Sequence, residues 1–492
     1  MTDIDTLYID GRWAPAQGTD SIPAMDSYDE TPMGRYRTAS AQDVDRAVRA
    51  ARQAFAGWSG TPLARRVEAV RQIAAELRSL EQALTESISR SVGMPRKLAA
   101  RIQVQAPIAA WDMYADLADE VPWTSRIGHS RIDLLPVGVV ACITPWNYPL
   151  HQITGKVAPA LLAGCTVVLK PSELAPASAY LLAQAVERAG LPAGVFNLVH
   201  GTGEQVGEAL TSHPGVDMVS FTGSTRAGRR IASVAGAGIK RLALELGGKS
   251  AALVLPGADL AAAVKATLAS CMLNAGQTCS ATTRLLAPHA ELAQVRALLA
   301  ELLPGYRMGD PAEPATRLGP LVSRAQQQKV LRTIDEAIKA GARPLGGSND
   351  GSRSAADQGS AMRPPAQGYF VPPTVLEVTP DMAIAREEVF GPVLSLIGYE
   401  DIEQGIALAN DTPYGLAATV WGATPEAALA VASRLRAGQV DVNGAPFNPA
   451  APFGGFGCSG LGRENGRHGI EGFLEPRAIQ LPSGYWPQAS QD

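Results

Sequence analysis

The stretch "GVVACITPWNYP", residues 138–149, joins a short apolar run to a polar turn bounded by two prolines. The run from Val139 to Ile143 is too short for a typical helix and rich in β-prone residues, which favours a strand buried on both faces. Asn147 then falls just beyond the end of that strand. Because ligands of parallel sheets bind beyond the carboxyl ends of the strands, this turn is a candidate site.

Four more apolar runs follow, separated by segments with helical patterns around 151–162, 176–189, 204–211 and 225–235. Strand-like runs that alternate with helices predict βαβ units and a parallel sheet. A second series begins after residue 279, so we expect two α/β domains that divide near "ELGGKS", residues 245–250. The first series is "CTVVLKP" (165–171), "GVFNLVHG" (194–201), "DMVSFTGS" (217–224) and "RLALELGG" (241–248), and the second is "TTRLLAP" (282–288), "VLSLIGY" (393–399), "AATVWG" (417–422) and "GQVDVNG" (438–444).

The first 120 or so residues are predicted to be mostly helical after a short β-prone segment, "LYIDGRW" (residues 7–13). Ser40 and Asp43 resemble a capping box, and an apolar stripe at helical spacing follows them. Thr61 and Pro62 are expected to open a second long helix, whose apolar stripe extends to Leu84.

Composition excludes several classes of protein. Of the 492 residues, 46% are hydrophobic and 18% charged, and the net charge of −4 comes without a long basic run, so neither nucleic acid nor a membrane surface is an expected partner. The acidic N-terminus resembles no signal peptide, and no apolar stretch reaches membrane-spanning length. Five cysteines without CxxC spacing and six scattered histidines predict a cytoplasmic protein with neither disulfide framework nor metal site. Residues 346–368, rich in Gly, Ser, Asp and Pro, are expected to form a solvated loop.

The predicted strand ends carry side chains that complement one another chemically. A glycine-rich helix start offers N–H groups to a pyrophosphate, and a carboxylate after a strand can accept from a ribose hydroxyl. An asparagine amide can donate to an oxyanion, and a glutamate can activate water. Each residue alone also has an ordinary explanation, such as a solvated lysine or a tight turn. Their shared location at the carboxyl edge of the predicted sheet favours a ligand-binding site instead. They are Asn147, Lys170, Glu173, Gly223, Ser224, Gly228 and Glu245.

Cys279 lies in the polar segment "LNAGQTCSATT", residues 273–283. From this window alone a buried structural cysteine is the commoner reading, because the thiol is a small apolar group. A thiolate beside an oxyanion donor and a glutamate would instead be a nucleophile.

Seven motifs, which occur along the chain in the order in which the family carries them, resemble the NAD(P)-dependent aldehyde dehydrogenase superfamily. The resemblance extends from about residue 8 to about residue 480. The resemblance implies an α/β fold: a Rossmann-like NAD-binding domain (1–117 and 137–247), an α/β catalytic domain (248–473) and a small β oligomerisation element (118–136 and 474–492). It also implies NAD as cofactor, an aldehyde as small-molecule substrate and a homodimer or homotetramer. The motifs are "PWNYP", "KPSE", "FTGS", "LELGGK", "GQTC", "EEVFGP" and "PFGGFGCSGLGRE".

By position in these motifs, the resemblance makes Cys279 the nucleophile and Glu245 the base that activates the deacylating water. Asn147 and the Cys279 backbone N–H would form the oxyanion hole, and Glu464 would be a nearby carboxylate that relays protons. For the cofactor, Lys170 and Glu173 would hold the adenine-side ribose, Gly223 and Ser224 the pyrophosphate, and Glu388 and Phe390 the nicotinamide end. The remaining cofactor residues expected on the same ground are Thr144, Trp146, Ser172, Gly203, Gly207, Phe221, Leu246 and Gly247.

The helix after "PWNYP" would line the aldehyde tunnel. Gly155 stands where many relatives that prefer small aldehydes carry a bulky aromatic, which predicts a medium or bulky apolar or aromatic substrate. Alternatively, Gly155 only permits close packing, with another side chain filling the gap. The chain departs from the family in a long 346–368 insert and in Ser280, where bulkier residues are common. The expected tunnel residues are His151, Gln152, Gly155, Thr278, Ser280, Phe447 and Phe453.

Two other functions compete with aldehyde oxidation to the acid. A CoA-acylating semialdehyde dehydrogenase would pass the acyl group to CoA, but enzymes of that type generally lack the glutamate found at Glu245. Non-catalytic reuse of the fold would be favoured by loss of Cys279, Asn147 or Glu245, and all three are present.

Overall fold

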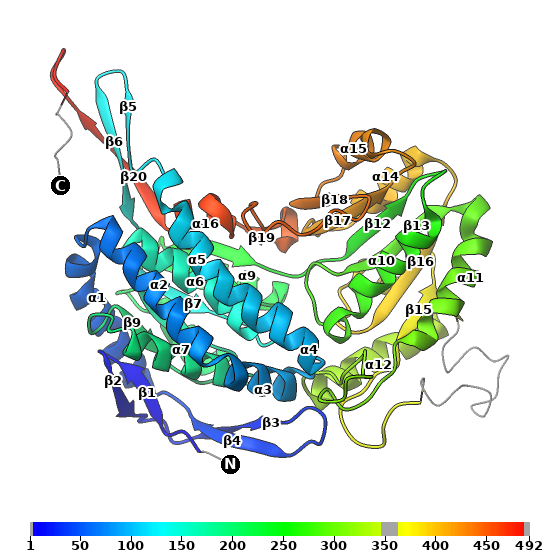
Figure 1. Ribbon diagram of the computed structural model, residues 1–492, viewed down its shortest axis with the longest axis horizontal. Helices are drawn as coiled ribbons and strands as arrows, with labels where there is room; N and C mark the ends of the chain where they lie inside the picture. Colours follow the sequence, from blue (N-terminus) through cyan, green and yellow to red (C-terminus); the bar gives the residue numbers. More distant parts are fainter. Residues whose placement is uncertain (1–2, 346–362, 487–492) are drawn as a thin grey trace.

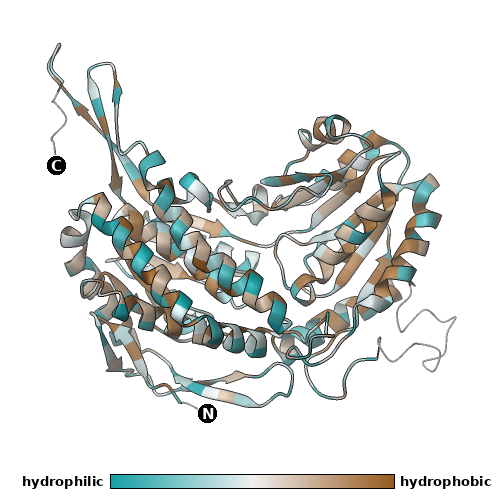
Figure 2. Cartoon of the chain, viewed as in Figure 1, coloured by the Kyte–Doolittle hydropathy of each residue, from teal (hydrophilic) through white to brown (hydrophobic). Residues whose placement is uncertain are grey.

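A computed structural model describes residues 3–345 and 363–486 of the chain, so most of the 346–368 segment lies outside the described residues. Two large sheets stand side by side, and a small third sheet projects from the first (Figure 1). The strands of the second sheet are mostly apolar, whereas polar residues gather on the outward sides of the helices (Figure 2). This distribution is that of an α/β protein, as the sequence predicts.

The first sheet has the strand order β19-β11-β10-β7-β8-β9-β1-β2. Its five central strands are parallel, whereas β19, β1 and β2 pair antiparallel with their neighbours. The central strands carry the apolar runs of the first predicted series, and every residue of β7, β8 and β10 is buried. The bounds are β1 Thr6–Ile9, β2 Arg12–Pro15, β7 Val139–Ile143, β8 Thr166–Lys170, β9 Phe196–Leu198, β10 Met218–Thr222, β11 Arg241–Glu245 and β19 Gly460–Leu461.

Helices connect and cover these strands. The Ser40 and Asp43 capping box at the start of α1 is confirmed, since each side chain accepts from the other's backbone N–H. The predicted long helix from residue 61 to 84 is wrong: it breaks at Leu80 into α2 and α3, although the apolar spacing continues across the break. The bounds are α1 Ala41–Ser59, α2 Leu63–Ser79, α3 Glu81–Val92, α5 Ala106–Asp116, α6 Pro149–Ala163, α7 Ala177–Arg188, α8 Glu208–Ser212, α9 Thr225–Ala237 and α16 Gly466–Glu471.

The second sheet has the order β14-β15-β16-β13-β12-β17-β18 and is parallel except for β14. The chain passes into it between Glu245, the last residue of β11, and Ser250, the first of β12. Strands β12, β14 and β15 were not among the predicted runs. The bounds are β12 Ser250–Val254, β13 Thr282–Pro288, β14 Arg343–Leu345, β15 Thr374–Glu377, β16 Val393–Tyr399, β17 Ala417–Trp421 and β18 Gln439–Val442, with helices α10 Leu260–Met272, α11 Leu292–Leu302, α12 Arg324–Lys339, α14 Ile402–Asn410 and α15 Pro425–Ala432.

The third sheet has the order β20-β6-β5 and extends away from the body of the molecule (Figure 1). All four residues of β5 are exposed. Its strands are β5 Thr124–Ile127, β6 Ser130–Pro136 and β20 Leu474–Gln480, and a separate hairpin is formed by β3 Ser21–Met25 and β4 Pro32–Arg37. Within residues 3–345 and 363–486, no helix combines the length and the hydropathy that a membrane crossing needs.

Candidate active site

Cys279 lies between α10 and β13, just after a strained turn. Asn274, Ala275 and Gly276 all have positive φ angles, of 53°, 54° and 75°. A β-carbon at Gly276 would stand 2.0 Å from the carbonyl oxygen of Gly391, so the turn also needs glycine for its close approach to the "EEVFGP" loop. Consecutive left-handed residues cost free energy and are commonest at functional sites.

Gln277 secures this turn from the inside. Its side chain is fully buried and accepts a hydrogen bond from the Val322 backbone N–H at 2.9 Å. Its amide nitrogen donates to the carbonyls of Asn274 (3.0 Å) and Val92 (3.4 Å). The polar residue two positions before Cys279 therefore fixes the backbone that presents the thiol.

Asn147 is held against the same turn. Its side chain is buried, and Nδ2 donates to the Gln277 carbonyl at 3.0 Å. The Asn147 carbonyl in turn accepts from Asn274 Nδ2 at 2.9 Å. Because an amide nitrogen carries two hydrogens, one donor of Asn147 is left for another acceptor near the turn that precedes Cys279.

Glu245 ends β11 with its side chain buried. Neither carboxylate oxygen has a hydrogen-bond partner among the described residues. A β-carbon at Gly454 (φ 148°) would stand 2.6 Å from Glu245 Oε1, so the "PFGG" backbone closes over this carboxyl only because it carries glycine. Burial, and then the negative charge of Glu464, raise the pKa of Glu245 well above its ordinary value, while Lys156 and Arg463 oppose the rise.

Glu464 is paired with a lysine that the motifs did not indicate. Lys156 Nζ donates to Glu464 Oε1, and the lysine is fully buried on α6. A buried lysine needs such a partner to remain charged. The pair lies close enough to Glu245 to affect its pKa, so three ionisable groups share one buried region.

The thiol of Cys279 is half-buried and faces acidic neighbours. Burial, followed by the carboxyls of Glu388 and Glu245, raises its pKa to about 12. The thiol is therefore harder to ionise than that of a free cysteine.

A cavity of about 320 Å³ opens onto Cys279. All seven predicted tunnel residues line it, together with Cys279 and Glu464. The rings of Phe447 and Phe453 lie edge to face with centroids 6.4 Å apart. Further lining residues that were not predicted are Ile102, Tyr148, Ser270, Leu273, Thr282, Ala417, Ala418, Thr419, Gln439, Asp441 and Asn465.

Gly155 faces a side chain rather than open space. A β-carbon there would stand 3.3 Å from Glu464 Oε2. The Glu464 carboxyl therefore occupies part of the room next to Gly155, as the packing alternative anticipates. Since Gly155 still lines the cavity, its role in substrate size stays a prediction.

The predicted cofactor residues fall into two groups, the first at or beyond the carboxyl ends of β7, β8, β9 and β10. Lys170 is buried with Nζ 3.6 Å from Glu173 Oε2, and its hydrocarbon chain lies near Gly207. Ser224 caps α9 by accepting from the Ala227 N–H at 3.2 Å, and Gly223 precedes it. The other members of this group are Thr144, Ser172, Gly203 and Phe221, of which Gly203 faces open space and Thr144 has a buried hydroxyl with no partner in the described chain.

The second group lies beside Cys279. Glu388 accepts from the Gly248 N–H at 3.1 Å, and a β-carbon at Gly247 would stand 2.5 Å from its carboxyl. The rings of Phe390 and Trp146 meet edge to face at 5.4 Å. Leu246 donates its N–H to the Ser459 carbonyl at 2.8 Å, which joins "LELGGK" to "FGCSG".

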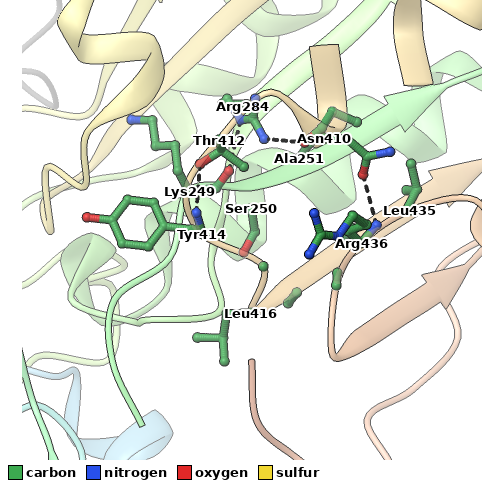
Figure 3. Close-up of a pocket in the computed structure, with 15 residues that line it drawn as sticks. Lys249, Ser250, Ala251, Arg284, Asn410, Thr412, Tyr414, Leu416, Leu435 and Arg436 are labelled. Atoms are coloured by element: carbon green, nitrogen blue, oxygen red, sulfur yellow. Dashed lines mark hydrogen bonds between the residues drawn. The ribbon is translucent and has the colours of Figure 1, made fainter. Parts of the chain in front are cut away.

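The loop between β11 and β12, residues 246–249, is also held in place at Lys249, its last residue (Figure 3). Arg284 donates to the Lys249 carbonyl at 2.8 Å and to the Ala409 carbonyl at 2.7 Å. It also donates to the Leu408 carbonyl at 2.8 Å. The small cavity around these groups, about 20 Å³, has room for about one water molecule. It is too small for a substrate. In residues 3–345 and 363–486, no cluster of three His, Cys, Asp or Glu side chains could hold a metal ion.

Comparison with known proteins identifies the family. The model of the aldehyde dehydrogenase family matches residues 13–479. The chain belongs to the aldehyde dehydrogenase family. A curated relative, 3-succinoylsemialdehyde-pyridine dehydrogenase of a Pseudomonas species, is 43% identical over 484 residues, which cover 97% of this chain and 99% of that protein.

Solved aldehyde dehydrogenases share the fold closely. An alanine-for-cysteine mutant of aldehyde dehydrogenase C from Pseudomonas syringae, complexed with NAD+ and octanal, is 45% identical with a TM-score of 0.92, over 97% of this chain and 96% of that one. The aldehyde dehydrogenase of Mycobacterium tuberculosis, complexed with NAD+, is 38% identical with a TM-score of 0.93, over 99% and 100% of the two chains. The predicted fold class is confirmed.

Four groups of this candidate site were given no role by the sequence analysis, although two of them lie inside the quoted motifs. Lys156 lies on a helix face that reads as apolar, and Gln277 reads as a polar loop residue. Ser459 bridges the Gly247 carbonyl (2.7 Å) and the Gly415 N–H (3.0 Å). The alternating "QVDV" pattern of β18, which sends Asp441 to the face opposite its valines, was the one local signal for a polar tunnel wall.

Proposed function

We propose that this aldehyde dehydrogenase oxidises an aldehyde to the carboxylic acid with NAD, through a thiohemiacetal and a thioester on Cys279. The observation that carries the proposal is the convergence of the Cys279 thiol and the Glu464 carboxyl on one cavity, with Glu245 close enough to raise the pKa of that thiol. The relatives complexed with NAD+, one of them also with octanal, support this chemistry.

In the first step, Cys279 Sγ attacks the carbonyl carbon and its proton passes to solvent, which the half-buried cysteine can reach, so Glu245 stays free to act as the base of the second step. The carbonyl oxygen becomes an oxyanion, which the free donor of Asn147 Nδ2 and the Cys279 backbone N–H would stabilise. Both groups belong to the hydrogen-bonded turn around Gln277, so the oxyanion site needs little reorganisation. The thiohemiacetal carbon then loses a hydride, which leaves a thioester on Cys279.

In the second step, water attacks the thioester and Glu245 takes its proton. The Glu245 carboxylate accepts no hydrogen bond from the described residues. It is therefore available to accept one from the attacking water molecule. The nearby Lys156–Glu464 pair offers a route by which that proton leaves the buried region. The products are the carboxylic acid and free Cys279.

NAD supplies the hydride acceptor when it is bound. The residues present fit such a cofactor: a capped 13-residue helix α9 offers backbone N–H groups, Gly203 leaves open space, and the partnerless hydroxyl of Thr144 lies just after β7. Lys170 and Glu173 would then hold the adenine-side ribose, and Glu388, Phe390 and Trp146 the nicotinamide end.

We predict that the enzyme prefers NAD to NADP. The Glu173 carboxylate can accept from a ribose 2′-hydroxyl but repels a 2′-phosphate, and its neighbour Lys170 at 3.6 Å weakens the repulsion. The kcat/KM ratio of NAD to NADP should be about tenfold or more, and Glu173→Gln should narrow it. Glu403→Gln, in an exposed ion pair with Arg434, serves as the control. A wild-type kcat/KM for NADP equal to that for NAD would contradict the assignment of Glu173.

The direct test of the reaction is NADH formation at about 340 nm from a panel of aldehydes without CoA. We expect NADH and free acid, because Glu245 permits hydrolysis of the thioester. A strict requirement for CoA would instead favour the acylating reaction, and no turnover with any aldehyde would favour a non-catalytic role.

The cavity size supports a medium or bulky aldehyde over acetaldehyde. Each buried CH₂ of such a substrate adds up to about 0.8 kcal/mol to binding. A large side chain at Gly155 would collide with Glu464. Ser280→Phe is therefore the better substitution for narrowing the cavity against bulky aldehydes.

The domain and assembly assignments extend the same proposal. Residues 1–117 with 137–247 would bind NAD, 248–473 would carry the nucleophile, and 118–136 with 474–492 would form the oligomerisation element of a homodimer or homotetramer. Strand β19, within 248–473, pairs with β11 of the first sheet, so the C-terminal part of that range contacts both sheets. The free edges of β5 and β20 are available for strand pairing with another copy.

A further inference from the structure

One wall of the cavity at Cys279 is made by the edge of the second sheet. Strands β17 and β18 are parallel, with Ala417 opposite Gln439 and Thr419 opposite Asp441. Residues paired in this way point to the same face, and residues two apart along a strand share that face. All four line the cavity, opposite residues of helix α6.

The alternation of β18 fixes the direction of its polar side chains. Val440 and Val442 pack against the hydrophobic core of the second sheet. Gln439 and Asp441 must therefore project from the other face, into the cavity. Gln439 Nε2 donates to Asp441 Oδ1 at 3.0 Å, which orients the carboxylate within this wall.

The charge of Asp441 has no counterpart in the cavity. Among the lining residues no lysine or arginine occurs, and the other carboxyl, Glu464, is already paired with Lys156. Asp441 forms no ion pair within the described chain. Its side chain is half-buried, and this burial raises its pKa against the opposing hydrogen bond from Gln439. Partly burying an unpaired carboxylate costs free energy, which a complementary ligand would recover.

We propose that Asp441, oriented by Gln439, is a specificity determinant that favours aldehydes with a positively charged nitrogen at the far end and disfavours aldehydes with a carboxylate tail. The attraction acts on the substrate tail, away from the reacting carbonyl, so it changes the choice of substrate and not the chemistry. Selection against the anionic tail is as much a part of the effect as selection for the cation, because specificity is a difference of affinities. The inference rests on the proposed aldehyde oxidation.

The test is a set of three aldehydes of matched length: hexanal, 6-oxohexanoate and 5-(trimethylammonio)pentanal. At about pH 8, well above the ordinary range of a carboxyl pKa, wild-type kcat/KM should rank cation above neutral above anion. Asp441→Asn keeps the shape and the acceptor for Gln439 but removes the charge. It should lower kcat/KM for the cation and raise it for the anion, each on the order of tenfold, and change hexanal far less. Asp335→Asn, on the exposed side of α12, should change none of the three.

Equal wild-type kcat/KM for the anion and the cation, or an unchanged ratio in Asp441→Asn, would overturn the inference. In either case oxidation of hexanal would show that the proposed function still holds. Failure to oxidise any of the three, or any aldehyde of a wider panel, would overturn the proposed function and this inference with it.

Discussion

Replacing Cys279 with alanine should lower kcat by at least about 10⁴-fold, because Cys279 is the only thiol among the residues that line the cavity and hydroxyls are far weaker nucleophiles. NAD binding should survive with little change in Kd, since the expected cofactor residues lie on other loops. Steady-state NADH formation and titration calorimetry with NAD measure the two effects.

Cys458→Ala is the matched control for this variant. Cys458 is the other half-buried cysteine, but it contacts Arg229 at 3.5 Å and does not line the cavity. Its replacement should leave kcat nearly unchanged. Substantial turnover by Cys279→Ala would disprove the covalent mechanism.

Replacing Glu245 with glutamine should separate the two halves of the reaction. The amide keeps the shape of the side chain but cannot accept a proton, so the thioester forms and is hydrolysed slowly. We expect kcat to fall by about 10²–10⁴-fold, with a burst of NADH close to one equivalent per active site. Rapid mixing with absorbance at about 340 nm resolves the burst.

The pH profile gives a second readout of Glu245. The base works only when deprotonated, and burial with Glu464 raises its pKa, so wild-type kcat should climb as pH rises through a value above the ordinary range of a glutamate. Glu245→Gln should lose this limb, whereas Glu403→Gln, in an exposed pair with Arg434, should retain it. Unchanged kcat in Glu245→Gln would assign the base elsewhere, with Glu464 the next candidate.

Local pattern predicted much of this fold and site. Apolar runs located the parallel strands because both faces of each strand are buried, and the Ser40 and Asp43 spacing located the start of α1. The seven expected tunnel residues, which came from the family resemblance and not from local pattern, line one cavity.

The features that were missed depend on contacts between distant segments. Lys156 and Glu464 are separated by 308 positions, and no local pattern around either residue indicates that the two are paired. The break at Leu80 carries no glycine or proline, so periodicity alone continues through it. Asp441 becomes a tunnel residue only because β18 is the edge strand of its sheet, which depends on the strand order.

The central claim, an acyl group carried on Cys279, is tested most directly by intact-protein mass spectrometry. Glu245→Gln is mixed with NAD and hexanal, quenched in acid and digested to locate the modification. We predict that the protein gains the mass of one hexanoyl group, located on the peptide that contains Cys279. An unmodified protein despite a measured NADH burst, or an acyl group on a peptide without Cys279, would contradict the account.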